Sequence, residues 1–593
     1  MRTHAAILPA SGYGAVTFGG GLSSRHGSVL PMPPTSRIHA ISDRFLDDHV
    51  RLNPIGATLI GVDGYDDQLT DYSPDAAAER AGLAARALRD IDAEVPVDDS
   101  DRVAQAVFHE RTRAELDVYE AGLLVGELNV VASPVQDTRM VFDLMATETA
   151  DDWATIAKRL ARVPDAVAGI RAGLAYAADH GHVAALRQVT KTAEQCGVWA
   201  GQSGEPSFFA SLIAGARDVP GVSDALRTEL EAGAVAAATA YGDLGAYLRT
   251  ELAPKAPRKD AVGPDVYPLW LKYFTGATVD LAELYQWGWE EFFRVETEMK
   301  QVAGRIRPGA SLAEAAAALD ADPRYQLTGA DALQRWMQGL SDNALRELGG
   351  THFDLPDELL NLECRIAPPG GPAGAYYTGP SADFSRPGRM WWSLVPGQER
   401  FSTWRETSTV YHEGVPGHHL QIATSVYQAD KLNRYQRLMA GTSGHAEGWA
   451  LYAERLMREL GYLSDDGDLM GMLDAHLFRA GRVIIDIGMH LELEIPRGTG
   501  FHEGERWTPD LGLEFMVNRT ITDAAQLSDE VDRYLGWPGQ APSYKLGERV
   551  WLAARDEAKQ RNAERFDLAV FHKRALEMGS MGLDTLRERL AEL

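Results

Sequence analysis

The sequence predicts a mostly α-helical protein, and three observations support this fold class. Apolar residues recur at helical spacing from Ile38 onward. Helix starts are clearly marked, because Ser73 precedes Pro74, and Ser311 precedes Glu314 in the pattern of a capping box. The chain of 593 residues is 45% hydrophobic and 24% charged, a composition typical of a globular protein with a substantial core.

Changes in composition along the chain indicate its organisation. The first 35 residues are rich in Gly, Ser and Pro, which is typical of a linker or disordered segment, and the true start is either Met1 or Met32. A second stretch rich in Pro and charge, residues 253–268, marks a boundary further along. We therefore expect three parts: a linker-like N-terminus over 1–35, an N-terminal helical lobe over 36–260 and a C-terminal lobe over 261–593.

Two segments of the C-terminal lobe have distinct patterns. Residues from Asp280 to about Arg307 carry apolar side chains at helical spacing and predict one long helix. Residues 362–401 are instead rich in Gly, Pro and aromatic side chains, which favours a short strand or hairpin, with Met390 to Leu394 as its extended part. Such a strand could align a peptide substrate by pairing with its backbone.

Charge and cysteine content exclude several classes of function. The chain has 85 acidic and 58 basic residues, a net charge of −27, and no basic cluster that would bind nucleic acid. Because it also lacks a membrane-spanning apolar run and a secretory leader, we expect no membrane partner and a cytoplasmic location. The two cysteines, Cys196 and Cys364, are too few for a thiolate zinc site, so any metal must be held by His and carboxylate side chains.

The strongest chemical signal is HEGVPGHH at residues 412–419, which contains three His and one Glu in eight residues. A His followed at once by a Glu is typical of a zinc hydrolase helix, in which imidazoles bind the metal and the carboxylate accepts a proton from water. This pattern predicts His412 as a metal ligand and Glu413 as a general base. The alternative, a polar helix end with histidines in solvent, would make this composition a large coincidence.

The spacing of this motif departs from the usual form, in which the second His follows the first by four residues. Pro416 occupies that position and must interrupt a regular helix. In an unbroken helix His418 would lie about 120° from the face of His412, and His419 would lie on that face but about 10.5 Å away. A bulge at residues 415–417 would return His418 to the face of His412, so we expect His418 as the second ligand, with His419 as the alternative.

A third ligand is expected on the helix predicted for residues 444–460. Glu447 lies near its start, and a glutamate on a separate downstream helix completes the His-His-Glu sets of zinc peptidases. The alternative is that Glu447 only complements the helix dipole. His445 is expected either behind the site or on the surface, and Glu454 and Glu459 are expected to be solvated charges.

Four motifs together resemble a known family. HEGVPGHHLQ, EGWALYAERL, RAGRVIIDIGMH and WPGQAPSYKLG are similar to the bacterial domain of unknown function 885, over a range from about Ile38 to the C-terminus. That family is regarded as zincin-like, similar to the helical peptidases around thimet oligopeptidase, angiotensin-converting enzyme and the Taq-type carboxypeptidases. The resemblance implies a two-lobed helical architecture with a deep central cleft and a small β hairpin or edge strand near the active site.

The resemblance also implies roles for particular residues. It implies one divalent cation, zinc, bound by His412, His418 and Glu447, with Glu413 as the general base. The two extra residues before the second His leave open which of the two adjacent histidines binds, and also which metal is bound.

A late tyrosine is the second candidate for catalysis. Residues 534–547, YLGWPGQAPSYKLG, resemble the segment from which helical zincins donate a phenol to the oxyanion of the tetrahedral intermediate. This resemblance implies that Tyr544 is the donor, with Tyr534 as the alternative. A packed aromatic side chain is an equally good interpretation of Tyr544.

The helix expected before this segment has a polar stripe on an otherwise apolar sequence. The stripe faces either the metal cleft, where it would orient ligands, or a second helix as a buried ion-pair ladder. Its residues lie four apart along the helix: Arg482, Asp486 and His490.

The motifs and the resemblance together predict a zinc-dependent peptidase or amide hydrolase that cleaves short peptides by a metal-activated water. One alternative is a metal-dependent hydrolase of a non-peptide amide in a small-molecule pathway. Another is a non-catalytic helical binding scaffold with a structural metal. We expect a short peptide or small amide as the only partner, and the sequence leaves the oligomeric state open.

Overall fold

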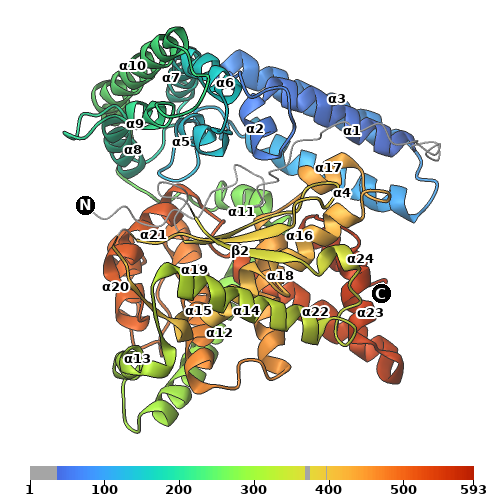
Figure 1. Cartoon of the computed structure of the whole chain (residues 1–593). Helices are drawn as coiled ribbons and strands as arrows, with labels where there is room; N and C mark the ends of the chain where they lie inside the picture. The colour runs from blue at the N-terminus through green and yellow to red at the C-terminus, as the bar shows by residue number, and fades with distance from the viewer. Residues whose placement is uncertain (1–35, 368–373, 396) are drawn as a thin grey trace. The chain divides into compact units, whose positions relative to one another are not determined.

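The computed structural model describes residues 36–367, 374–395 and 397–593, so the expected linker-like segment 1–35 lies outside the described residues. The fold is mostly α-helical, as predicted (Figure 1). The chain forms two compact units. The N-terminal unit ends at Asp260, and the C-terminal unit contains Ala261–Leu593 together with an earlier segment, Asp98–Arg111. Helix α4 (Asp99–Glu120) contains most of that segment and continues into the N-terminal unit.

The N-terminal unit is a set of helices around one apolar core. Buried aromatic side chains from three of its helices, Trp153, Phe209 and Tyr241, lie in this core. Ser73 accepts a hydrogen bond from the backbone of Ala76 at the start of α3, so the predicted helix start is confirmed. The helices lying wholly in this unit are α1 (Arg37–Leu52), α2 (Pro54–Leu59), α3 (Pro74–Asp92), α5 (Pro134–Met140), α6 (Ala150–Ala161), α7 (Val163–Asp179), α8 (Leu186–Trp199), α9 (Phe208–Ala214) and α10 (Asp224–Tyr247).

The C-terminal unit contains long helices that pack in pairs. Helix α12 packs along α19, α18 packs along α22, and α15 packs against both α18 and α19. The helices of this unit are α11 (Tyr267–Thr275), α12 (Leu281–Ile306), α13 (Leu312–Ala321), α14 (Ala330–Leu348), α15 (Thr403–Glu413), α16 (His418–Tyr427), α17 (Arg434–Leu438), α18 (Ser443–Glu459), α19 (Asp466–Leu491), α20 (Pro509–Arg519), α21 (Ala524–Gly536), α22 (Ser543–Asn562), α23 (Leu568–Leu576) and α24 (Leu583–Leu590).

Two predicted features of this unit are confirmed. Asp280 caps the long helix α12 by accepting hydrogen bonds from the backbone of Ala282 and Glu283. Ser311 and Glu314 form a capping box at the start of α13. Both cases depend on side chains next to the backbone that they cap, which is why local sequence was sufficient to predict them.

Two small sheets belong to the C-terminal unit. Strands β2 (Leu362–Ile366), β4 (Gly388–Trp392) and β3 (Ala375–Thr378) form one sheet in that order, with β2 parallel and β3 antiparallel to β4. Strands β1 (Gln326–Thr328) and β5 (Arg400–Ser402) form an antiparallel pair. The three-stranded sheet is drawn in yellow in Figure 1.

The sheet corrects one expectation about substrate alignment. The segment Met390 to Leu394 was expected to pair with a peptide backbone, but β4 is the central strand and is hydrogen-bonded on both sides. The outer edge of β2 is also engaged, because Gln338 bonds both Leu362 and Cys364, and Gln334 bonds Cys364. Both partner strands lie earlier in the segment 362–401, and the sequence of Met390 to Leu394 alone did not indicate that its strand would be central.

Helices α18 and α22 approach each other closely at two glycines. A Cβ atom added to Gly448 would lie 2.4 Å from the Cα atom of Gly547, so neither position tolerates a side chain. Gly448 directly follows Glu447, and Tyr544 lies one turn before Gly547. The close approach therefore brings the helix that carries Glu447 to the helix that carries Tyr544.

Candidate metal centre

The break in the HEGVPGHH motif separates two helices. Helix α15 ends at Glu413 and α16 begins at His418, so the expected interruption is a complete turn rather than a bulge within one helix. Gly417 is required in this turn, because a Cβ atom there would lie 1.8 Å from the carbonyl oxygen of His412. As a result, the ring centroids of His412 and His418 are 5.0 Å apart.

Helix α18 holds this turn in place. The indole N–H of Trp449 donates hydrogen bonds to the carbonyl oxygens of Pro416 and Gly417, each at 3.0 Å. Trp449 is fully buried and lies two residues after Glu447. The same helix therefore supplies Glu447 and fixes the backbone on which His418 is carried.

The structure brings together three of the predicted residues. His412, His418 and Glu447 each offer a ligand atom, and these atoms all lie within 4.8 Å of one another in a buried position. Glu447 Oε2 is 3.2 Å from His412 Nε2 and 4.0 Å from His418 Nε2. Donors about 2.0–2.1 Å from a tetrahedral zinc ion are about 3.3 Å apart. The three side chains could therefore hold one cation with only a small adjustment of His418.

His419, the alternative second ligand, points elsewhere. Its Nε2 donates to the carbonyl oxygen of Leu359 at 2.9 Å, so Nδ1 accepts the hydrogen bond from the hydroxyl of Tyr377, also at 2.9 Å. Both nitrogens are thus engaged away from His412. The structure places His418, not His419, beside the first histidine.

The electrostatics of the three residues favour positive charge between them. Burial opposes the protonation of His412, but the hydrogen bonds that its ring donates to Glu447 and Glu454 outweigh burial and raise its pKa to about 9. Burial would raise the pKa of Glu447, but the hydrogen bond and charge of His412 lower it to about 2. Burial, together with the charge of His412, lowers the pKa of His418 to about 4. A neutral His418 is ready to bind a metal, and a divalent cation would replace the proton on Nε2 of His412.

Glu413 directly follows His412 and lies next to this group. Its side chain is half-buried, and burial raises its pKa to about 7. Within the described parts of the chain no hydrogen bond holds its carboxylate. A carboxylate with a pKa near neutrality and without a fixed partner suits a general base.

Tyr544 is in the first turn of α22, and two guanidinium groups lie near its ring. The guanidinium carbon of Arg482 is 4.7 Å from the ring centroid, and that of Arg479 is 5.8 Å away. Burial and the charge of Glu447 raise the pKa of Tyr544, so the phenol keeps its proton at neutral pH. Its hydroxyl makes no hydrogen bond to any residue that the structure describes.

The alternative tyrosine is fully engaged. The hydroxyl of Tyr534 donates to Glu530 Oε2 at 2.5 Å and accepts a hydrogen bond from Arg482 Nε at 2.8 Å. Tyr534 is 1% exposed. Among the residues that the structure describes, the hydroxyl of Tyr534 is therefore engaged and that of Tyr544 is not.

Glu454 was expected to be a solvated charge, but it is buried. It is 1% exposed, and its Oε1 accepts a hydrogen bond from Nδ1 of His412 at 2.8 Å. Ser408 donates to its other oxygen, and Arg479 Nη1 lies 3.3 Å from Oε1. Glu454 follows Glu447 by two helical turns and therefore lies on the same face of α18. That spacing is the signal that could have identified it, whereas Glu459 is exposed as expected.

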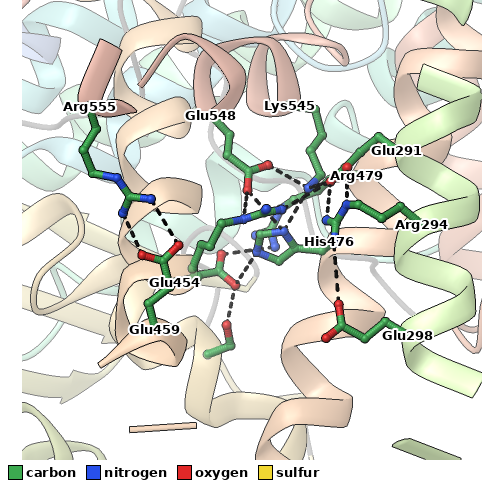
Figure 2. A network of polar contacts seen from close by, with 12 residues as sticks. Glu291, Arg294, Glu298, Glu454, Glu459, His476, Arg479, Lys545, Glu548 and Arg555 are labelled. Carbon is green, nitrogen blue, oxygen red and sulfur yellow. Dashed lines mark hydrogen bonds and ion pairs between the residues drawn. The ribbon is translucent and has the colours of Figure 1, made fainter. Parts of the chain in front are cut away.

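Behind Glu454 lies a buried network of charges (Figure 2). His476 Nε2 is 3.6 Å from Glu454 Oε2, and Nδ1 of the same ring is 2.9 Å from the ammonium of Lys545. Lys545 also donates to Glu291 at 2.9 Å and to Glu548 at 2.7 Å. The side chain of Lys545 is 0% exposed. Lys545 lies within the quoted motif WPGQAPSYKLG, but the sequence predicted no role for it or for His476.

The polar stripe of α19 is a buried ladder that contacts neighbouring segments. Arg482 pairs with Glu530 at 2.9 Å, and His490 Nε2 is 3.0 Å from the carbonyl oxygen of Tyr534. Asp486 accepts hydrogen bonds from the backbone of Gly539 at 2.9 Å and from Tyr267 at 2.6 Å. The ladder anchors the turn that precedes Tyr544 and contacts no metal-binding candidate directly.

His445, for which two positions were considered, is buried 3.2 Å from the side chain of Gln421.

The comparisons with known proteins identify the family. The model of the family described as "Bacterial protein of unknown function (DUF885)" matches residues 54–590. The chain belongs to this family. The resemblance inferred from the four motifs is thus confirmed, and the family description states no activity. No curated protein matches the chain significantly.

Two solved structures share the fold. "The crystal structure of the putative lipoprotein from Colwellia psychrerythraea" matches with a TM-score of 0.79 and 22% identity, covering 94% of this chain and 98% of that one. A structure described as "a putative lipoprotein of unknown function from Shewanella oneidensis" matches with a TM-score of 0.71 and 17% identity, covering 94% and 100%. A structure described as "putative Oligoendopeptidase F" reaches 14% identity over 95% and 94% of the chains, but its TM-score of 0.39 is too low to indicate a shared fold.

These structures correct the expected cytoplasmic location. Both fold relatives are described as lipoproteins, which are anchored to a membrane outside the cytoplasm, so that expectation is contradicted. The expectation of a cytoplasmic location depended on the lack of a recognisable leader sequence, and that lack does not establish where a protein is located. Separately, no helix among the described residues has the length and apolarity needed to span a bilayer.

Proposed function

We propose that the protein is a metal-dependent amide hydrolase that cleaves short peptides. His412, His418 and Glu447 would hold one divalent cation, and zinc suits a donor set of two imidazoles and one carboxylate. The burial of these residues and the demand for positive charge between them support this assignment.

The residues around the cation would divide the chemistry between them. Zinc, when bound in such a site, lowers the pKa of a bound water and polarises the scissile carbonyl. Glu413 would accept the proton of the attacking water and deliver it to the leaving amine. The hydroxyl of Tyr544 would donate a hydrogen bond to the oxyanion that forms at the carbonyl carbon.

One observation carries this proposal: Glu413, beside the three candidate ligands, has a carboxylate that no described residue holds by a hydrogen bond. A structural zinc site is closed by four protein ligands. The group found among the described residues contains three, and its neighbour is a carboxylate with a pKa near neutrality. This combination supports catalysis over a purely structural metal.

The small sheet supports an extended peptide as substrate. Since β4 is paired on both sides and the outer edge of β2 is occupied by glutamine side chains, β3 (Ala375–Thr378) has the outer edge with which a peptide backbone could pair. Tyr377 of β3 bonds His419, which adjoins the candidate ligand His418. A peptide on β3 would therefore run close to the helix that follows the candidate metal centre.

The test combines metal analysis with digestion of a peptide library read by mass spectrometry. We expect about one zinc per chain in both the parent protein and Glu413→Gln, and peptide cleavage only by the parent. An equally active Glu413→Gln variant would remove Glu413 from the mechanism. A parent that binds zinc but cleaves no peptide would favour a non-peptide amide as substrate.

A further inference from the structure

The buried ammonium of Lys545 determines where the proton lies on His476. An ammonium group has three donors and no acceptor. Lys545 directs these donors to Glu291, Glu548 and Nδ1 of His476, at 2.9, 2.7 and 2.9 Å. Nδ1 of His476 must therefore accept a hydrogen bond, and it cannot carry a proton itself.

The proton of His476 consequently lies on its other nitrogen. Burial, together with the charge of Lys545, lowers the pKa of His476 to about 4, so the ring is neutral at physiological pH. With Nδ1 as an acceptor, the neutral ring carries its proton on Nε2. This nitrogen faces Glu454 Oε2 at 3.6 Å, and Figure 2 shows the ring between Glu454 and Lys545.

Glu454 lies between His476 and the metal centre. A carboxylate has acceptors only, so its Oε1 must receive the Nδ1 proton of His412, at 2.8 Å. The remaining nitrogen of His412, Nε2, then presents its lone pair towards Glu447 and any cation beside it. The hydrogen bonds from Lys545 to His476 and from His412 to Glu454 thus each have one possible direction, and between them the Nε2–H group of His476 faces Glu454 at 3.6 Å.

We propose that Lys545 and His476 are positioning residues: His476, with its proton kept on Nε2, holds the Glu454 carboxylate behind His412, so that His412 offers Nε2 to the metal. The inference rests on the metal site of the proposed function, not on its reaction. Carboxylates that orient metal-binding histidines are common, and their loss typically lowers metal affinity about 10–100-fold. Here Glu454, the carboxylate that orients His412, would itself be held in place by His476 and, through it, by the buried ammonium of Lys545.

The competing interpretation is that Lys545 only balances the buried charges of α12 and α22. Glu291 and Glu548 are also paired with Arg455, at 3.3 and 2.8 Å. Under that interpretation His476 is a packing residue, and any side chain of similar volume should serve equally well.

Two substitutions of His476 separate these interpretations. In His476→Gln, the amide oxygen can accept from Lys545 and the amide N–H can donate to Glu454, so a group that holds Glu454 in place is retained. In His476→Leu, the volume is retained but the contacts with Lys545 and Glu454 are both lost. Zinc affinity of the metal-free full-length protein is measured by competition with a chromophoric chelator, and metal-free thermal unfolding reports folding.

We expect His476→Gln to bind zinc within about threefold of the parent and His476→Leu to bind it about 10–100-fold more weakly. Glu459 lies on the same helix as Glu454, is exposed and pairs with Arg555. Glu459→Gln is therefore the matched control and should bind zinc like the parent. Parent-like affinity in a folded His476→Leu variant would overturn the proposal. Equal losses in both His476 variants would overturn it as well, and a parent that binds no zinc would remove the metal site itself.

A second measurement decides the case even if His476→Leu does not fold. Selective ¹⁵N labelling of histidine in the parent distinguishes the two neutral tautomers, and His476→Gln identifies the His476 signals by their loss. We expect His476 to be protonated on Nε2 only. A proton on Nδ1 would contradict the direction that Lys545 imposes.

Discussion

Glu454 accepts a hydrogen bond from Nδ1 of His412 at 2.8 Å, and both side chains are almost completely buried. Burial would raise the pKa of Glu454, but Arg479 and hydrogen bonds with His412 and His476 hold it well below its usual range. Glu454 is therefore a permanent carboxylate behind the histidine that would bind the metal.

Removal of this carboxylate should weaken both metal binding and the fold. In Glu454→Ala the N–H group of His412 and the charge of Arg479 would remain buried without their partner, which typically costs about 3–5 kcal/mol of the free energy of unfolding. We expect zinc affinity to fall about 10–100-fold in addition. Chelator competition and urea unfolding measure these effects, and unchanged zinc affinity would exclude Glu454 from the site.

Substitution of Tyr544 should lower the rate of the reaction without changing metal binding. In Tyr544→Phe we expect kcat to fall about 100–1000-fold, because one oxyanion donor is lost, while zinc content and Tm stay near the parent values. Tyr534→Phe is the matched control. Its hydroxyl bonds Glu530 and Arg482, so this variant should lose stability more than turnover. Full activity in Tyr544→Phe would leave the phenol as a packing group.

The turn between the two histidines should not tolerate a side chain at Gly417. In Gly417→Ala the added carbon would lie 1.8 Å from the carbonyl oxygen of His412, so the turn must move and the two histidines must separate. We expect a loss of about 1–3 kcal/mol in the free energy of unfolding and loss of tight zinc binding. Gly304→Ala, on α12 with no atom near the added carbon, is the control. Zinc binding by Gly417→Ala at parental affinity would show that this turn does not set the site.

The N-terminal unit should lose stability as the pH rises. Burial, with the charge of Asp137, raises the pKa of Glu127 to about 8, and burial raises that of Asp137 to about 7. Because the folded state binds these protons more tightly than the unfolded chain, the stabilisation is complete below pH about 4 and is lost as the pH rises to about 8.

Glu127→Gln tests this pH dependence. The amide stays neutral at every pH, so at pH 8 the variant should be more stable than the parent by about 1 kcal/mol or more, equivalent to roughly 2–4 °C in Tm. Thermal unfolding from pH 5 to 9 measures the difference, with the exposed Glu79→Gln as the control. Parallel pH profiles for the parent and Glu127→Gln would contradict the assigned burial of Glu127.

Features encoded close together in the chain were predictable from sequence. The caps at Ser73 and Asp280 act on adjacent backbone. The break at Pro416 follows from its missing N–H group and fixed ring, and this break led to His418 as the second ligand. The structure places His418 beside His412 as that argument required, although a full turn replaces the expected bulge.

Features that depend on packing between distant elements were not predictable. Glu454 and Lys545 have side chains that are normally exposed, and they are buried here because α18, α19 and α22 pack against one another. The central position of β4 depends on a parallel partner, β2, that precedes it by more than twenty residues. The partner of a strand does not follow from local sequence, and the only local signal for Glu454 was its spacing of two helical turns from Glu447.

The central claim is that His412, His418 and Glu447 bind one divalent cation, and the two adjacent histidines provide its most direct test. Zinc stoichiometry is measured after dialysis in the parent, His418→Gln and His419→Gln, with thermal unfolding as the check on folding. We predict about one zinc per chain in the parent and in His419→Gln, and none retained in a folded His418→Gln. Retention of zinc by His418→Gln with its loss from His419→Gln would contradict the account.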